Sequence, residues 1–343
     1  MDVTYLNESP AEAQAWNRYV DQSASATSDH LWEWRRVLSG AFHFRPYYLG
    51  AWEGDRLVGI LPLFLVPRGF GRSALSSIPF GNYGGICADS EEATQALLQK
   101  AQELLRQLRC EYLELRHKSP LPLPGLSHQQ LHSRFVFPLN GNPEQHLRDL
   151  GNAHRKKFQK ATRNGLSVVS SRDVQQFYPV HLHTAQRHGT PCFPRSYFQL
   201  ILREFSDKAK AHLVLLREQV IAYDLILLFK ESYVCQFNGS LTSFLSFYPN
   251  NLLFWHAIEE GCSLGKKEVD YCRSRTDSGA AAFKRGLRFV EEPLGYQYVL
   301  PGNKELPQRN PSNPKYQWAI RTWKALPVAL TQCVGPSLVR YFA

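Results

Sequence analysis

The chain lacks any hydrophobic run long enough to cross a bilayer and lacks the usual sequence motifs of zinc proteases and of P-loop nucleotide-binding proteins. Its longest uninterrupted apolar run is about seven residues, from Ile60 to Val66, whereas a transmembrane helix needs roughly 20. The N-terminal stretch MDVTYLNESPAEAQAW carries acidic residues and no apolar core, which predicts no signal peptide. The motif H-E-x-x-H and the Walker A loop are absent. We therefore expect a protein that does not span a membrane.

Paired cysteine motifs are also missing. The seven cysteines are odd in number and none forms a C-x-x-C pair, which excludes a disulfide framework and a zinc site of the usual spacing. This pattern is typical of a reducing compartment, where most cysteines serve as small core residues. The sequence therefore predicts a cytoplasmic protein without a bound metal.

Length and charge indicate the number of domains and the kind of partner. The 343 residues are enough for two domains, and the hydrophobic and charged fractions, 43% and 20%, are ordinary for a globular protein. The formal net charge is +10. Such an excess favours an anionic partner, such as nucleic acid, a phosphate-bearing substrate or an anionic membrane surface. A soluble protein that is simply basic is the alternative that charge alone leaves open.

One order of elements occurs twice along the chain. The segment LGAWEGDRLVGILPLF predicts a β-hairpin, and LVLLREQVIAYDLILLF predicts a second one in the other half. Each hairpin is followed by a strand, a helix and a strand that begins with Glu and ends with Arg, EYLELR at 111–116 and EVDYCR at 268–273. Two copies of one α/β (α+β) unit, each a mixed sheet flanked by helices, explain this self-similarity.

The segments outside the repeats complete the predicted layout. Between the copies, a strand over 131–139 and a helical segment from Pro143 to about Asn164 follow a proline-rich stretch. The sequence after 302 predicts amphipathic helices that pack on the core. We therefore expect domains at 1–140 and 141–302, and a helical tail over 303–343.

Three segments carry candidate functional residues. The helix piece HRKKFQKATRNG has five cations and no acid, including Arg155 and Lys156, and could contact phosphates or form a solvated face. The strand end DYCRSRTDSGAAAFKRG holds Asp270, Arg273, Ser274 and Lys284. An aspartate near fixed cations can act as a general base, and the cations can bind phosphate or an oxyanion; a structural Asp–Arg pair is the alternative.

The third segment is the loop PFGNYGG over 79–85. Its glycines allow backbone to approach a ligand, and Asn82 and Tyr83 supply hydrogen-bonding groups. A plain turn between strands is the alternative.

Together these motifs resemble one known group. The sequence is similar to FemAB-type transferases, especially FemAB-related proteins of bacterial exopolysaccharide and PEP-CTERM (exosortase) systems. The resemblance is carried along nearly the whole chain by GDRLVGILPLFLV, SSIPFGNYGGICAD, YLELR, HRKKFQKATRNGLSV, FYPNNLLFWHAIEEGCSLGKKEVDYCRS, AFKRGLRF, PLGYQYVL and NPSNPKYQWAIRTWKALP.

The resemblance implies tandem GNAT-like (acyl-CoA N-acyltransferase) domains and an enzyme that transfers an acyl or aminoacyl group to an amine of a cell-envelope or exopolysaccharide precursor, such as peptidoglycan. The donor would be aminoacyl-tRNA or acyl-CoA, with no tightly bound cofactor, and the acceptor a phosphate-bearing small molecule or a lipid-linked one. DNA is not expected as a partner. Catalytic roles fall on Asp270, Arg273 and Lys284. Substrate-binding roles fall on Asn82, Tyr83, Arg116, Arg155, Lys156, Asn250 and Ser274.

Two departures from the family pattern keep alternatives open. The chain lacks the coiled-coil arm that some glycine-adding members use with tRNA, and it lacks the R/Q-x-x-G-x-G/A loop that holds acetyl-CoA. One alternative is a GNAT-type N-acetyltransferase that uses acyl-CoA. Another is a non-catalytic protein that binds a carbohydrate or lipid-linked polymer. Aromatic and basic residues of the tail, including Trp318 and Arg321, also suit peripheral contact with the anionic inner face of a membrane.

Overall fold

A computed structural model describes residues 1–343 except 124, 303–305 and 307–313. The chain divides into two compact units by its contacts. Unit 1 contains Met1–His132, Pro293–Arg309 and Arg340–Ala343, and unit 2 contains Ser133–Glu292 and Asn310–Val339. Strands β7 (Ser127–Pro138) and β13 (Val290–Val299) each carry the chain from one unit into the other.

Unit 1 is a mixed sheet flanked by helices. Its strands follow the order β1-β2-β3-β4-β6-β13, with β5 paired to β3. The β4–β6 pair is parallel and the β6–β13 pair antiparallel. The other elements of unit 1 are β1 (Asp2–Leu6), α1 (Pro10–Gln22), η1 (Ser28–His30), α2 (Glu33–Phe42), β2 (Arg45–Glu53), β3 (Arg56–Gly69), β4 (Arg72–Ser76), β5 (Cys87–Ala88), α3 (Glu91–Gln107), β6 (Leu113–Leu115) and η4 (Arg340–Phe342).

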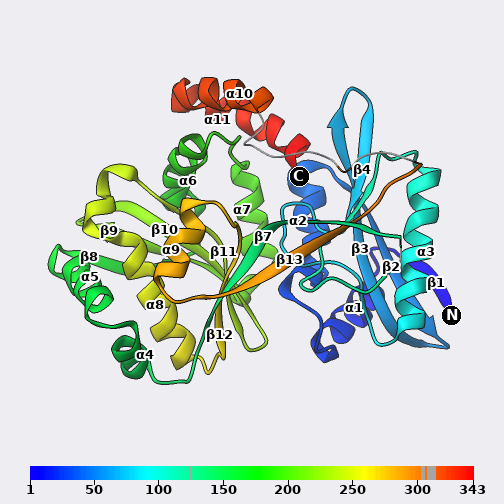
Figure 1. The fold of residues 1–343 in the computed structure, drawn as a ribbon, viewed down its shortest axis with the longest axis horizontal. Helices are drawn as coiled ribbons and strands as arrows, with labels where there is room; N and C mark the ends of the chain where they lie inside the picture. The colour runs from blue at the N-terminus through cyan, green and yellow to red at the C-terminus, as the bar shows by residue number, and fades with distance from the viewer. Residues whose placement is uncertain (124, 303–305, 307–313) are drawn as a thin grey trace. The chain divides into compact units, whose positions relative to one another are not determined.

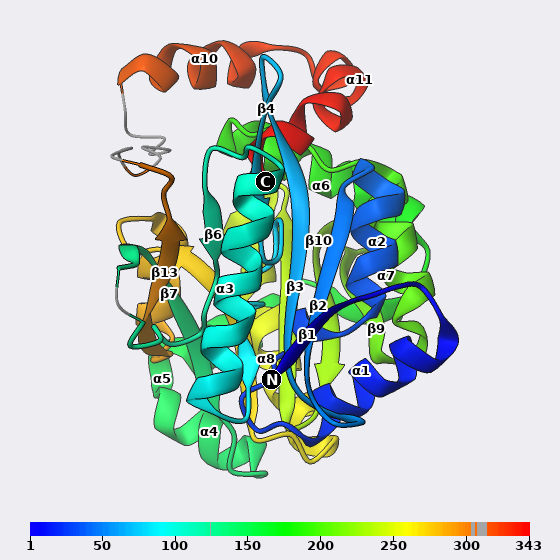
Figure 2. The same cartoon turned by 90° about the vertical axis from the view of Figure 1, so that its right-hand side faces the viewer.

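Helices cover both faces of this sheet (Figure 2). Tyr48 on β2 packs against Trp16 of α1 on one face. The next residue, Leu49, points to the other face and belongs to the core beneath α3. Helix α3 begins as its sequence predicts, because the Ser90 side chain caps the backbone N–H of Ala93 and acidic residues fill the first turn.

Unit 2 repeats this plan, and its strands follow the order β7-β12-β11-β10-β9-β8. The β11–β12 pair is parallel, as β4–β6 is in unit 1. Its remaining elements are α4 (Pro143–Leu150), α5 (Asn152–Arg163), β8 (Leu166–Ser171), α6 (Val174–His188), α7 (Arg195–Glu204), η2 (Ser206–Lys208), β9 (Ala209–Leu216), β10 (Gln219–Phe229), β11 (Ser232–Ser240), η3 (Thr242–Phe247), α8 (Pro249–Ser263), β12 (Glu268–Arg275), α9 (Gly279–Gly286), α10 (Pro314–Ala325) and α11 (Val328–Val339).

The two faces of the unit 2 sheet are also covered (Figure 1). Tyr223 of β10 stacks on Phe177 of α6 on one face. Its neighbour Ala222 packs on the other face with Ala161 of α5 and Leu252 of α8. The predicted hairpin–strand–helix–strand order is therefore confirmed in both halves, as β2-β3-β4-α3-β6 and β9-β10-β11-α8-β12.

Two local features qualify the predicted layout. The helical segment from Pro143 is two helices rather than one, because Gly151 at φ 83° breaks it between α4 and α5. The tail forms α10 and α11, and Trp323 of α10 donates a hydrogen bond to the carbonyl of Thr190 at the end of α6. Among the residues described, no helix combines the length and the apolar character needed to cross a bilayer.

Candidate active site

The candidate site begins where two parallel strands of unit 2 stop pairing. Strands β11 and β12 are in register only from Ser232 with Glu268 to Val234 with Asp270, although both strands continue. Just beyond that point β11 has a bulge, since Cys235 and Phe237 lie opposite the adjacent residues Ile226 and Leu225 of β10. Strand backbone that leaves its neighbour is available to hydrogen-bond a ligand.

Asp270 lies at this divergence and is held on both carboxylate oxygens. One oxygen accepts a 2.8 Å hydrogen bond from Nε of Arg134 on β7, and the other accepts a 2.7 Å bond from the backbone N–H of Cys272. Burial raises the pKa of Asp270, and the charge of Arg134 opposes that rise. The ion pair that the sequence left as an alternative is therefore present, with a cation that is distant in sequence.

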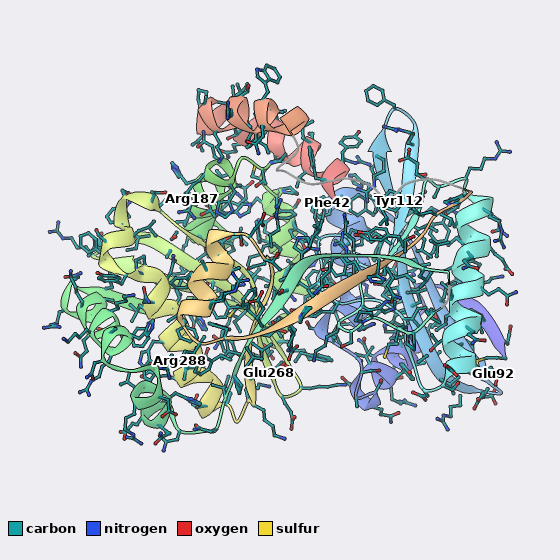
Figure 3. The ribbon with its side chains drawn as sticks, in the orientation of Figure 1. Phe42, Glu92, Tyr112, Arg187, Glu268 and Arg288 are labelled. Carbon is teal, nitrogen blue, oxygen red and sulfur yellow. The ribbon has the colours of Figure 1, made fainter. Side chains whose placement is uncertain are left out.

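Arg134 gathers two more carboxylates, which the sequence did not point to. Its guanidinium contacts Glu268 at 2.5 Å, labelled in Figure 3, and Glu292 at 2.8 Å. The side chain of Arg134 is only 4% exposed. A buried arginine surrounded by three carboxylates fixes β7, β12 and the start of β13 at the base of the site.

Lys284 of α9 contacts the C-terminal half of β12. Its Nζ donates to the carbonyl of Tyr271 at 2.5 Å and to Oγ of Ser274 at 2.9 Å. The residue is 6% exposed. Burial lowers the pKa of Lys284, and the neighbouring Cys272 and Asp270 oppose that change. The structure thus brings the predicted residues Asp270, Ser274 and Lys284 together, with Arg273 partly buried between them along β12.

A second buried carboxylate, Asp224, joins this network and was missed at the level of sequence. The hydroxyl of Tyr271 donates a 2.7 Å hydrogen bond to Asp224 on β10. Burial raises the pKa of Asp224 to about 7, against the hydrogen bond from Tyr271 and the charge of Lys284. A single acid in the apolar strand QVIAYDLILLF was the available signal, since a buried carboxylate needs a specific reason.

In unit 1, the predicted ligand-binding residues Asn82, Tyr83 and Arg116 take part in hydrogen bonds that fix the buried loop at 79–85. The carboxylate of Asp29 accepts hydrogen bonds from the backbone N–H groups of Asn82 and Tyr83. Arg116 donates to the carbonyls of Ile78 and Gly81 at 3.0 and 3.1 Å. Asn82, Tyr83 and Arg116 are all buried, so they hold the loop shape; their contact with substrate stays a prediction.

The predicted basic helix, α5, presents an open cationic face. Arg155 and Lys156 are exposed, and neither forms an ion pair with a carboxylate in the described part of the chain. Lys160 lies over the ring of Tyr248 at 5.3 Å, which joins α5 to the start of α8, where Asn250 is partly buried. Helix α5, which carries Arg155 and Lys156, packs through Phe158 on Trp255 of α8, the helix that begins beside Asn250.

Two grooves open on unit 2 near these elements. One, of about 700 Å³, is lined by residues that include Asn164 at the end of α5 and Phe247 of η3. The other, of about 430 Å³, is lined by residues that include Arg187, labelled in Figure 3, Lys324 and the hydroxyl residues Thr242 and Ser243. No carboxylate lines the second groove, so it suits an anionic group.

One cluster has the residue types of a metal site. Ligand atoms of His212, His256 and Glu260 lie within 4.8 Å of one another. Burial lowers the pKa of His256 to about 4, so its imidazole is neutral at pH 7. However, Glu260 already accepts hydrogen bonds from Lys210 at 2.5 Å and from Tyr233 at 2.8 Å. The ammonium group of Lys210 already neutralises the charge of Glu260, so this arrangement fits a partly buried ion-pair network better than a metal centre.

Comparison with known proteins agrees with this architecture. Residues 149–285 match the model of a protein family described as an acetyltransferase (GNAT) domain. No curated protein matches the chain by sequence. The matched segment contains α5, β11, the β12 divergence and Lys284, so it covers the candidate site.

Three solved structures show the same fold at low identity. The crystal structure of FemX has a TM-score of 0.69 at 14% identity, covering 93% of this chain and 100% of that one. The C-terminal domain of a putative lysylphosphatidylglycerol synthetase from Agrobacterium fabrum has a TM-score of 0.58 at 14% identity, covering 86% and 93%. A tandem GNAT protein from the clavulanic acid biosynthesis pathway has a TM-score of 0.54 at 14% identity, covering 89% and 99%.

These comparisons confirm two of the predictions. The fold is that of tandem GNAT-like units, each with a mixed sheet flanked by helices. The class is that of an acyltransferase, because a GNAT acetyltransferase domain covers the second unit's site. The donor, the acceptor and the roles of individual residues are taken up as proposals.

Proposed function

We propose that this protein transfers an acyl or aminoacyl group to an amine of a cell-envelope or exopolysaccharide precursor. The observation that carries the proposal is the buried network of Asp270, Ser274 and Lys284 at the β11–β12 divergence, inside the segment that matches a GNAT domain. The names of two structural neighbours, FemX and lysylphosphatidylglycerol synthetase, support an acceptor at the cell envelope.

The proposed reaction is direct aminolysis of an activated acyl group. The acceptor amine attacks the carbonyl carbon of an ester or thioester, and a C–N bond forms as the C–O or C–S bond breaks. The amine loses a proton, and the leaving tRNA hydroxyl or coenzyme A thiol gains one. The chain must therefore orient the amine, accept a proton and stabilise the oxyanion that develops on the carbonyl oxygen.

The side chains at the divergence match these tasks. Lys284 uses two of its three donors on Tyr271 and Ser274, so one N–H is left to stabilise the oxyanion. Asp270 would orient or deprotonate the amine, and its raised pKa makes it a stronger base than an exposed aspartate. Because both its oxygens already accept hydrogen bonds, this role requires Asp270 to release one of them. Arg273 would bind a phosphate group beside it.

The cationic surfaces of unit 2 support a phosphate-bearing donor or acceptor. We propose that Arg155 and Lys156 on α5 bind the phosphates of aminoacyl-tRNA or of a lipid-linked acceptor, and that Asn250 contributes a hydrogen bond at the start of α8. The carboxylate-free groove at Arg187 and Lys324 offers a second phosphate subsite. In unit 1, the loop at 79–85 would contact substrate through its backbone. Asn82, Tyr83 and Arg116 would contribute to this binding indirectly, by holding the loop in shape.

The experiment is a transfer assay on the full chain with acetyl-CoA, charged tRNA and UDP-sugar peptides, read by mass spectrometry of the acceptor. Lys284→Met keeps the length of the side chain and removes the donor, so we expect the rate of the chemical step to fall about a hundredfold or more with donor binding retained. Lys267→Met is the matched control, because that lysine is 70% exposed and pairs only with Glu231 among the described residues.

The outcome separates the proposal from its two rivals. Product from charged tRNA would support aminoacyl transfer. Product from acetyl-CoA alone would support an N-acetyltransferase, the alternative that the description of the matching family favours. Tight binding of a polymer with no product from any donor would support the hypothesis of a non-catalytic protein that binds a carbohydrate or lipid-linked polymer. Equal rates for Lys284→Met and wild type would show that the catalytic assignment is wrong.

A further inference from the structure

The C-terminal helices have an unusual charge pattern. From residue 306 onward the chain contains no Asp or Glu, and it carries Arg309, Lys315, Arg321, Lys324 and Arg340. Helix α10 therefore has no carboxylate of its own to balance its cations. A one-signed segment of this kind attracts an anionic surface.

Helix α11 uses one side to pack on unit 2. Thr331, Gly335 and Val339 are buried at helical spacing. A Cβ on Gly335 would lie 2.7 Å from Sγ of Cys192, so this glycine allows the helix to approach closely. The carbonyl of Thr331 accepts a 3.5 Å bond from the same thiol. The packed side of α11 is thus fixed.

A second side of α11 carries an exposed apolar stripe. Leu330, Val334 and Leu338 recur every four residues and are 47%, 39% and 36% exposed. Other exposed apolar side chains of unit 2, such as Leu264 and Val290, do not repeat at helical spacing. Exposed apolar residues that line up along one side of a helix indicate an interaction surface, whereas isolated ones do not.

Helix α10 adds an aromatic residue and a cation on its open side. Trp323 bonds to Thr190, and a Cβ on Gly189 would meet Ile320, so this side of α10 lies against the end of α6. Trp318, by contrast, is 75% exposed, and Arg321, three residues later, is exposed as well. A tryptophan beside a cation is typical of the boundary between headgroups and acyl chains.

We propose that α10 and α11 form a docking surface for an anionic lipid bilayer. Leu330, Val334, Leu338 and Trp318 would enter the boundary region, and Arg321 would pair with lipid phosphate. From residue 306 onward the tail has no Asp or Glu side chain, which favours an anionic bilayer over a protein partner, whose rim would present charges of both signs. Docking goes beyond the proposed transfer reaction and does not depend on it, since it requires neither donor nor acceptor.

The test is co-sedimentation of the full chain with vesicles of phosphatidylcholine, with and without phosphatidylglycerol. We expect binding only to the anionic vesicles, and weaker binding as salt is raised. The double variant Leu330→Asp, Leu338→Asp should bind at least about tenfold more weakly, and Arg321→Glu a fewfold more weakly. Leu264→Asp is the matched control, with a similarly exposed leucine at 46%, and should bind as wild type does.

Two further readouts keep the proposal open to disproof. Trp318 fluorescence should shift to the blue on anionic vesicles, and Trp318→Phe should lose that shift. Light scattering then detects self-association: a dimer that Leu330→Asp, Leu338→Asp converts to monomer, without vesicle binding by wild type, would assign the stripe to a second copy and overturn the proposal. Equal vesicle binding by wild type and the double variant would overturn it as well.

Discussion

A single buried carboxylate, Asp224, has an unusual electrostatic environment in unit 2. It lies in the middle of the apolar strand β10, is 2% exposed, and has the Tyr271 hydroxyl as its hydrogen-bond donor. Its pKa near 7 places the carboxyl group where a proton can be gained or lost at neutral pH. We infer that Asp224 influences the proton balance around Tyr271 and Lys284 without needing to touch substrate.

The raised pKa of Asp224 predicts a specific dependence of stability on pH. In the unfolded chain this group titrates near 3.8 and in the folded chain near 7. Between pH 3.8 and pH 7 the carboxyl group of Asp224 holds its proton in the folded state only. The contribution of Asp224 to the free energy of unfolding therefore falls as pH rises through this range, by up to about 4 kcal/mol. Asp224→Asn removes the titration and should therefore gain stability relative to wild type from pH 4 to pH 8.

Urea unfolding at a series of pH values measures this difference. Asp207→Asn, an exposed change on η2, is the control and should shift little relative to wild type across the series. A constant difference between Asp224→Asn and wild type at all pH values would contradict the elevated pKa.

The residue scale also shows what the sequence could and could not predict. Asp270, Ser274 and Lys284 were identified because they lie close together along the chain in a strand–loop–helix segment. Arg134 was missed because it is 136 positions from Asp270, and Asp224 because it is 47 positions from Tyr271. Local patterns name residues that share an element, whereas the partner that fixes a charge depends on tertiary packing.

At the scale of elements, β7 and β12 depend on the Arg134 cluster. One guanidinium contacts Glu268 and Asp270 on β12 and Glu292 at the start of β13. Removing the arginine would leave the buried carboxylate of Asp270 without its cation, which is costlier than losing one exposed ion pair. The same reasoning makes Arg134 a support for the divergence of β11 and β12 rather than a catalytic group.

Arg134→Met is therefore expected to destabilise the protein by about 3 kcal/mol. Arg285→Met is a matched control, because Arg285 pairs with Glu291 on the surface and its loss should leave the unfolding midpoint nearly unchanged. Urea denaturation of the two variants at pH 7 measures both. A midpoint for Arg134→Met equal to that of wild type would mean that the cluster does not support the strands.

At the scale of the whole molecule, the path of the chain differs from a simple succession of segments. The sequence predicts boundaries at 140 and 302, which treat β13 as the end of the second domain. The contacts instead assign residues from Pro293 to unit 1, where Tyr296 and Tyr298 lie in a core cluster with Tyr83 and Tyr112. The hydroxyl of Tyr298 donates a hydrogen bond to Glu114, which is 184 positions away in the sequence. A local sequence pattern cannot predict a contact between residues so far apart.

This arrangement predicts the behaviour of fragments. A chain ending at residue 140 lacks the β13 residues that pair with β6, so it exposes a strand edge and the tyrosine cluster. We expect fragment 1–140 to aggregate or to melt without cooperativity, and co-expression with 141–343 to restore a soluble, cooperatively melting complex. The intact full chain is the control, because it contains every pairing strand in one polypeptide. A soluble 1–140 fragment with its own sharp thermal transition would instead support the boundary predicted from the sequence.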